Sequence, residues 1–321
     1  MLKYLRKFKL HIRFFFQNVK YRIRNYKLWG GDYNKTIVLI FSPELTHPGL
    51  TDRLKAIVSI YYIASTQGFN FKIIHSKPFE WSKYLSPNEC DWLVKESEIC
   101  KSFFHTKMLS YYPNKKPRLK ENFEYHIVSY EGNIHDDLRI GDIGENYSRL
   151  FSQLFKPSPY LNSYLTSIPY YGTEYVAIHF RFVNSFEVNE PNYPTRPVSN
   201  KEQALLENIC FAFIDSIQAE YPSSTILIFC DSNHFLSVSQ QKGYKHVEGK
   251  LGHISYANNE NVILKTFTDM FMIAGAKAVY AGVNDVLYAS AFPVCASHIS
   301  NVHFERRRLP NVLSDNSEIY R

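Results

Sequence analysis

A histidine and an arginine stand two residues apart at the end of an apolar run in the second half of the chain. The run, Tyr175 to Arg181, is rich in branched and aromatic residues, which is typical of a buried strand. His179 and Arg181 are then expected to point to the same face of that strand. A guanidinium at a strand end can bind a diphosphate through two parallel hydrogen bonds. The pair predicts a phosphate site, with solvated loop residues that bind nothing as the alternative.

Two further expected strands also end in polar groups. The run from Thr225 to Ser232 ends on Asp231, and the run Ala278 to Gly282 leads into Asn284 and Asp285. A helix is expected to open next, over 286–292, and its first amide N–H groups could face an anion. Ligands of open parallel sheets bind beyond the carboxyl ends of the strands, so these groups are candidate site residues. Helix caps and loop residues without a ligand are again the alternative.

Strand and helix patterns alternate along both halves of the chain, which favours parallel sheets. In the first half, strands are expected at 35–42, 71–76 and 124–130, and helices at 53–68 and 148–155. In the second half, helices are expected at 201–221 and 261–276. A Lys-Pro-Ser-Pro turn marks the domain boundary. The sequence predicts an α/β protein with two Rossmann-like domains facing a cleft, at 32–160 and 161–321.

Several common site motifs are absent from the sequence. There is no G-x-x-x-x-G-K-[ST] loop, no G-x-G-x-x-G fingerprint, no G-x-S-x-G elbow and no D-x-D pair. No metal site is therefore predicted. The five cysteines are widely spaced and form no C-x-x-C pair, so free thiols in a reducing compartment are expected.

Positive charge is concentrated at the amino terminus. The formal net charge is +7, from 37 Lys and Arg against 30 Asp and Glu. Residues 1–31 hold nine of the basic residues and no acid, so the remaining 290 residues are slightly acidic. Apolar residues recur there at steps of three and four, as on one side of a helix. They are Leu2, Leu5, Phe8, Ile12, Phe16, Val19, Ile23 and Tyr26.

A basic amphipathic helix of this kind is typical of a segment that lies on an anionic membrane surface. Packing of the helix on the protein's own body or on an oligomer partner is the first alternative, and nucleic-acid binding is the second. No apolar run is long enough for a transmembrane helix, and no secretory signal pattern is present. The predicted location is cytoplasmic, peripheral on the inner face of the membrane, with no nucleic-acid partner.

Three segments resemble the motifs of the GDP-fucose-dependent fucosyltransferase superfamily, in that family's order. They run from His47 to Ile73, from Val176 to Arg181 (the family's H-x-R strand) and from Glu260 to Asp285. The resemblance implies a GT-B fold whose second domain binds the nucleotide sugar. It also implies an inverting transfer that needs no metal and no other cofactor.

The resemblance also implies roles for individual residues. Arg181 would hold the β-phosphate, and His179 would lie beside it near the nucleoside. Asp269 would contact the guanine or its surroundings, and Asp231 would lie near the donor or the reaction centre. Arg53 and Asp52 would line the cleft from the first domain. Asn284 and Asp285 stand where the family has serines near the phosphates.

The expected function is transfer of a sugar, fucose from GDP-fucose, to a hydroxyl of a glycan or lipid-linked glycan acceptor in surface-polysaccharide biosynthesis. Such a transfer needs a general base to deprotonate the hydroxyl. Glu44, Asp52 and Asp231 are the candidates, and the sequence does not choose among them. The alternative function is a non-catalytic, membrane-associated module of the same fold that binds nucleotide sugars or glycans.

Overall fold

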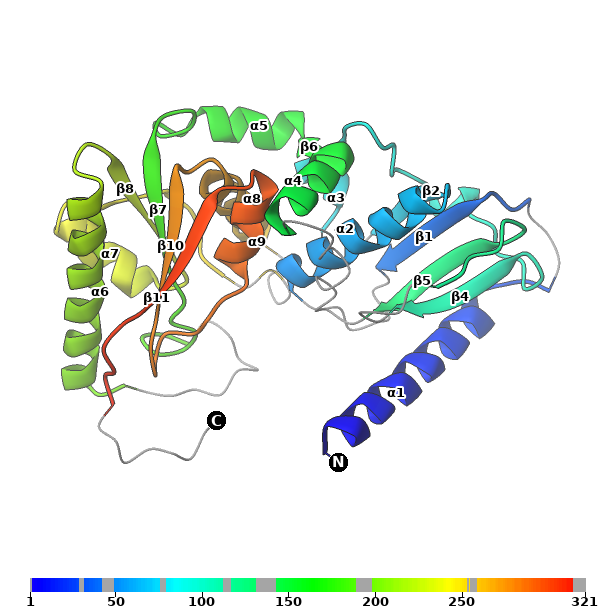
Figure 1. Cartoon of the computed structure of the whole chain (residues 1–321), viewed down its shortest axis with the longest axis horizontal. Coiled ribbons are helices and arrows are strands. Elements are labelled where there is room, and N and C mark those ends of the chain that lie inside the picture. Colours follow the sequence, from blue (N-terminus) through cyan, green and yellow to red (C-terminus); the bar gives the residue numbers. More distant parts are fainter. Residues whose placement is uncertain are drawn as a thin grey trace. The chain divides into compact units, whose positions relative to one another are not determined.

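The computed structural model describes residues 2–28, 32–41, 49–75, 79–111, 117–130, 143–188, 198–252, 254 and 259–313. Contacts divide the chain into two compact units, Met1–Ser158 and Pro159–Arg321. Each unit has a parallel sheet of its own (Figure 1). The sequence predicts the domain boundary between residues 160 and 161, and it predicts residues 1–31 as a segment separate from the first domain.

Within the described residues, the first unit contains a parallel sheet with the strand order β2-β1-β5-β4. Its strands are β1 (Thr36–Phe41), β2 (Asn70–His75), β4 (Thr106–Tyr111) and β5 (Glu124–Tyr130). All six residues of β1 are buried, as expected for a strand covered on both faces. The remaining elements are α1 (Leu2–Asn25), α2 (Leu50–Thr66), α3 (Trp81–Tyr84), β3 (Leu85–Pro87), η1 (Glu96–Glu98), α4 (Ile143–Leu154) and β6 (Phe155–Pro157).

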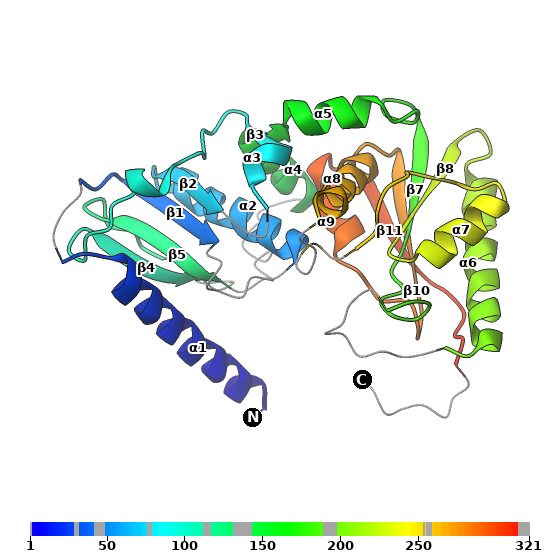
Figure 2. The ribbon, with the colours of Figure 1, turned by 180° about the vertical axis from the view of Figure 1, so that it is seen from behind.

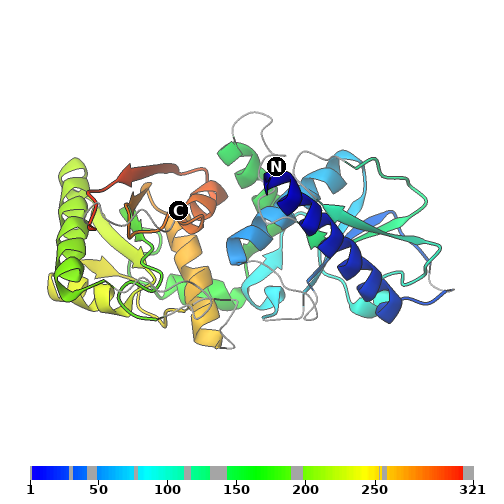
Figure 3. The same ribbon diagram turned by 90° about the horizontal axis from the view of Figure 1, so that it is seen from below.

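Helix α1 is fixed along one side to this sheet, across β4 and β5 (Figure 3). Tyr21 packs in a cluster with apolar side chains of β1 and β5. Asn18 Nδ2 donates to Ser110 Oγ at 2.7 Å, and Ser129 Oγ donates to Asn18 Oδ1 at 2.9 Å. Packing on the protein's own body therefore accounts for one side of α1.

Tyr26 corrects the predicted apolar stripe. The sequence predicts that Tyr26 is the last residue of one apolar side of the helix, the side that includes the exposed Phe8, Phe16 and Ile23. In the structure Tyr26 is instead buried against the sheet. Its hydroxyl hydrogen-bonds His126 Nδ1, and His126 Nε2 lies 2.7 Å from Glu124 Oε1. Burial raises the pKa of Tyr26, so the phenol stays protonated and can donate. This buried chain of hydrogen bonds holds the end of the helix to the sheet.

In the described part of the second unit, five parallel strands follow the order β11-β10-β7-β8-β9. They are β7 (Tyr175–Phe180), β8 (Thr225–Cys230), β9 (Lys245–His246), β10 (Ala278–Val283) and β11 (His303–Arg308). Figure 2 shows α6 and α7 on one face of the sheet and α8 and α9 on the other. The helices are α5 (Pro159–Thr166), α6 (Asn200–Glu220), α7 (Asn233–Gln241), α8 (Glu260–Ala274) and α9 (Phe292–Ile299).

The prediction that a helix opens over 286–292 is wrong. Asn284 Oδ1 accepts hydrogen bonds from the amide N–H groups of Val286 and Leu287, which makes a turn after β10. A loop follows, and α9 begins only at Phe292, with a proline in its first turn. Proline suits that position because its ring already has a helical φ and the missing N–H would have no helical partner.

Among the described residues, no helix combines the length and the apolar character needed to cross a bilayer. The five cysteines are free thiols, and all but Cys90 are buried.

Candidate functional site

The strand order of the second unit reverses at β7. From β7 the chain proceeds through α6 to β8 and β9 on one side, and it later returns through α8 to β10 and β11 on the other. Helices of opposite direction leave a crevice at such a point, beyond the carboxyl ends of the strands. The ends of β7 and β10 carry the residues that the sequence singled out.

His179 lies near the end of β7 and is 7% exposed. Its ring packs against Phe292, at the start of α9, with the ring centroids 6.1 Å apart. Burial, together with the charge of Arg181, lowers the pKa of His179 to about 3. The imidazole is therefore neutral at pH 7. It can donate or accept a hydrogen bond there, but it adds no positive charge to the site.

Arg181 follows β7 directly, and 22% of its side chain is exposed. Its Nη1 lies 3.2 Å from Asp231 Oδ2, at the end of the neighbouring strand β8. Its carbonyl accepts the amide N–H of Tyr288 at 2.9 Å, which ties it to the loop before α9. Asp231 thus holds the guanidinium at the switch point, and the loop before α9 fixes the backbone that carries it.

Asp231 shapes the loop that carries Arg181. One carboxylate oxygen accepts the amide N–H of Phe182 at 2.7 Å, and the other accepts that of Val183 at 2.8 Å. Val183 has a φ of 56°, which is strained for a branched residue, so these bonds offset a local cost. Burial raises the pKa of Asp231, while Arg181 and the two amides oppose that rise. Asp231 is a positioning residue here, and its role as general base stays a prediction.

Asp269 lies inside α8 and forms a buried ion pair with Lys265, one helical turn earlier. Burial raises the pKa of Asp269, and the ammonium group opposes it. The stem of Lys265 packs against Gly249, where an added Cβ would lie 2.5 Å from the lysine Cδ. Sequence reasoning missed Lys265. A lysine and an aspartate four residues apart in an otherwise apolar helix are the signal that could have found it.

Asn284 and Asp285 have structural partners on the carboxy-terminal segment. Asn284 Nδ2 donates to the carbonyl of Pro310 at 2.9 Å. The two carboxylate oxygens of Asp285 accept the amide N–H groups of Val312 and Leu313, each at 2.9 Å. The carboxylate of Asp285 is therefore engaged by backbone donors of the carboxy-terminal segment.

A further carboxylate that the sequence did not single out lies beside this edge. Glu187 accepts hydrogen bonds from the amide N–H groups of Asn233 and His234 at the start of α7, and from Ser232 Oγ. It satisfies donors that a helix otherwise leaves without partners. The positive end of α7 is thus already matched with a negative charge.

In the first unit, Arg53 and Asp52 occupy the first turn of α2. Arg53 is buried, with Nη1 3.1 Å from His75 Nε2 and its guanidinium near the ring of Phe41. Burial lowers its pKa. Asp52 pairs with Lys55 at 2.6 Å and keeps 34% of its side chain exposed. Glu44 lies outside the described residues. Over the described ranges, no group of three or more His, Cys, Asp or Glu is arranged to hold a metal.

Solved structures share this architecture. NodZ, an α-1,6-fucosyltransferase co-crystallised with GDP, is 13% identical, covers 83% of this chain and 92% of its own length, and has a TM-score of 0.53. A variant of Arabidopsis thaliana FUT1 in complex with GDP is 12% identical, covers 93% of this chain and 74% of its own, and has a TM-score of 0.51. NodZ from Bradyrhizobium matches at 13% identity with a TM-score of 0.51, and covers 83% of this chain and 92% of its own. The chain has a fucosyltransferase-like GT-B fold.

No protein-family model matches the chain, and no curated protein matches it in sequence. The likeness to the solved fucosyltransferase structures therefore establishes the fold alone. Within this fucosyltransferase-like fold, His179 and Arg181 lie at the switch point of the second unit, where the fold class binds its ligands.

Proposed function

We propose that the protein is an inverting, metal-independent glycosyltransferase that moves fucose from GDP-fucose to a hydroxyl of a glycan or lipid-linked glycan acceptor. The observation that carries the proposal is the position of Arg181. It lies at the topological switch point of the second unit, where Asp231 pairs with its guanidinium and the loop before α9 bonds its backbone carbonyl. The GDP and GDP-fucose bound to the solved fucosyltransferases support the choice of donor.

The chemistry of the transfer fits this arrangement. The departing nucleoside diphosphate carries negative charge, and a preorganised arginine stabilises that charge in the transition state. His179 is neutral and can offer a hydrogen bond to the nucleotide beside it. The Lys265–Asp269 pair is the candidate for base recognition. The first unit is the proposed acceptor domain, with Glu44 and Asp52 as candidate bases.

The proposal is tested by calorimetric titration of the full chain with GDP, GDP-fucose and UDP. We expect saturable binding of both guanine nucleotides and binding of UDP that is at least about tenfold weaker, because a site built for one base leaves polar groups unpaired with another. Absence of GDP binding at millimolar concentration would overturn the proposal. Binding without transfer or donor hydrolysis would instead favour the non-catalytic nucleotide-sugar-binding module.

We further propose that α1 docks the protein on an anionic membrane surface at the cytoplasmic face. Its outer side carries apolar side chains that are between 37% and 70% exposed. These are Phe8, Ile12, Phe15, Phe16, Val19 and Ile23. They recur at helical spacing, while the opposite side of the helix is fixed to the sheet through Asn18 and Tyr21. The outer side is therefore a distinct apolar face.

Positive charge borders this apolar face. Lys9, Arg13, Lys20 and Arg24 are all exposed and recur at steps of four and seven, which makes one stripe along α1. Each basic residue near an anionic bilayer contributes about 1 kcal/mol. On the other side, a groove of about 600 Å³ between α1 and β4 is lined in part by Phe15, Val19 and Met108. The combination supports a lipid surface as the partner.

Docking is tested by sedimentation of the full chain with vesicles that contain 30% or no anionic lipid. Replacing Phe15, Phe16 and Ile23 by serine removes large side chains from the exposed face, so we expect membrane partitioning to fall at least about 100-fold. The control replaces Leu93 and Leu205 by serine, since these apolar residues are exposed elsewhere. The proposal fails if the wild type stays in the supernatant with anionic vesicles, or if the triple variant sediments like the control.

A further inference from the structure

The edge strand β11 presents two different sets of side chains on the two faces of the second unit's sheet. Alternation along the strand puts His303, Glu305 and Arg307 on the α6 face. It puts Phe304, Arg306 and Arg308 on the face covered by α8 and α9.

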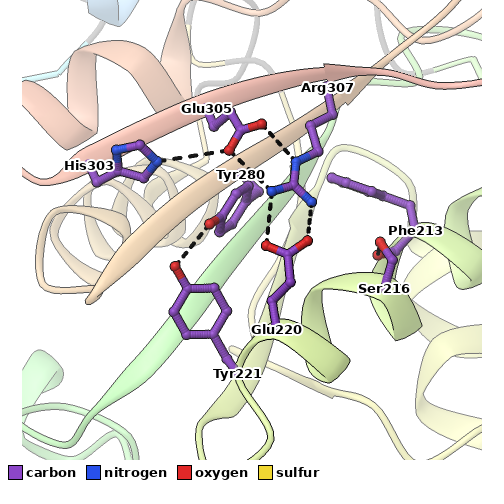
Figure 4. A network of polar contacts seen from close by, with 8 residues as sticks. All are labelled: Phe213, Ser216, Glu220, Tyr221, Tyr280, His303, Glu305 and Arg307. Atoms are coloured by element: carbon purple, nitrogen blue, oxygen red, sulfur yellow. Dashed lines mark hydrogen bonds and ion pairs between the residues drawn. The ribbon is translucent and has the colours of Figure 1, made fainter.

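The α6 face of β11 is a closed network of charges (Figure 4). Arg307 binds both carboxylate oxygens of Glu220, at 2.5 and 2.9 Å, and both of Glu305, at 2.8 and 3.1 Å. Its guanidinium also lies 4.8 Å from the ring centre of Tyr280. Two carboxylates surround this one cation, so Arg307 serves the structure of the sheet and α6.

On the other face, the register aligns β11 with the candidate site. Ala281 of β10 pairs with His179 on one side and with Arg306 on the other. One step further, Val283 pairs with Arg308, and Arg181 follows His179 by two residues. Paired residues of parallel strands point to the same face, so His179, Arg306 and Arg308 share it, and the two-residue repeat continued past the end of β7 puts Arg181 on it as well. The two strands lie about 10 Å apart, which long arginine side chains can bridge.

Side-chain contacts agree with this placement. Arg306 Nη2 donates to the carbonyl of Ser290 at 3.3 Å, in the loop that precedes α9. Phe292, two residues further on, is the residue against which the His179 ring packs. Both Arg306 and Arg308 are exposed. Arg306 therefore lies on the same face of the sheet as His179 and contacts the loop that also bonds the backbone of Arg181.

The charge balance of the candidate site calls for additional cations. A nucleoside diphosphate carries two to three negative charges, yet Arg181 is paired with Asp231 and Lys265 with Asp269. The low pKa of His179 leaves it neutral. Without further positive charge, these groups offer a diphosphate little net compensation.

We propose that Arg306 and Arg308 bind the diphosphate of the donor together with Arg181. The inference rests on the proposed function and names the residues that complete its phosphate site. Charge-assisted hydrogen bonds from two more arginines would hold the donor and stabilise the leaving diphosphate. They would act from the edge strand β11. The side chains of Asn284 and Asp285, which the sequence proposed near the phosphates, instead bond the backbone of the carboxy-terminal segment.

The test replaces both arginines by glutamine in the full chain and measures calorimetric binding of GDP and of inorganic pyrophosphate. We expect the dissociation constants of both ligands to rise at least about 30-fold, because two charge-assisted contacts are lost. The matched control is Arg307→Gln, in the same strand but on the opposite face. It is expected to lower thermal stability and to leave both dissociation constants within about twofold.

The outcomes separate this inference from the proposed function. If the wild type binds GDP and the double variant binds it within threefold as tightly, the inference fails alone. If the wild type binds pyrophosphate but not GDP, and the double variant loses pyrophosphate, the cationic site stands and the guanine-nucleotide donor fails. A wild type that binds neither ligand overturns both.

Discussion

Arg181→Ala is expected to reduce kcat/KM for sugar transfer, and donor hydrolysis with it, by at least about 100-fold. The guanidinium lies at the switch point, where Asp231 pairs with it and the loop before α9 bonds the backbone of the same residue. Its loss removes positive charge from the position where negative charge develops on the departing diphosphate. Transfer assays with GDP-fucose, together with calorimetric titration of GDP, measure the effect.

Two variants keep this prediction interpretable. Arg181→Lys retains the charge but not the planar fork, so we expect it to recover part of the affinity and little of the rate. Lys277→Ala removes an exposed cation from the opposite, amino-terminal end of the sheet, where it pairs with Glu174 at 2.8 Å. It should leave transfer unchanged. Near-normal transfer by Arg181→Ala would remove this arginine from the phosphate site.

Asp231→Ala is expected to destabilise the second unit by about 3–5 kcal/mol. The change leaves the amides of Phe182 and Val183 and the guanidinium of Arg181 without their carboxylate. The three tryptophans all lie before residue 93, so tryptophan fluorescence reports the first unit. We expect the unfolding transition measured by tryptophan fluorescence to be unchanged, while hydrogen exchange of peptides from 175–188 becomes faster.

Asp231→Asn distinguishes positioning from base catalysis. The amide keeps one acceptor oxygen, so we expect partial loss of protection in 175–188 and a proportionate loss of transfer. If Asp231 were the general base, the asparagine variant would lose transfer while its loop stayed protected. Full stability and full activity of Asp231→Ala would contradict both roles.

The elements of the fold that bury apolar side chains on regular spacing could be predicted from the sequence. The strand at 124–130 agrees with β5 residue for residue, and helices α6 and α8 begin and end within two residues of the expected bounds. The strand β11 was missed because it lies at the sheet edge. Its sequence, His-Phe-Glu-Arg-Arg-Arg, contains one apolar residue, since its charges face helices and solvent rather than a core.

Only the part of the candidate site that lies directly at the ends of predicted strands could be predicted from the sequence. His179 and Arg181 stand two residues apart in the sequence, at the end of β7. What their neighbours do depends on partners far along the chain. Asp231 binds the backbone at 182–183, and Arg306 shares a sheet face with His179 only because β10 pairs with both β7 and β11. The spacing of residues in the sequence does not indicate pairings between such distant parts of the chain.

The packing of α1 has a consequence for protein synthesis. Asn18 bonds Ser129, which is 111 residues later in the chain. At about 5–20 residues per second, the ribosome needs several seconds after finishing α1 to produce the strand on which it rests. Throughout that interval Phe14 and Tyr21 have no sheet to cover them, and both apolar sides of α1 face outward. The nascent chain thus exposes more apolar surface on α1 before its first unit has folded than afterwards.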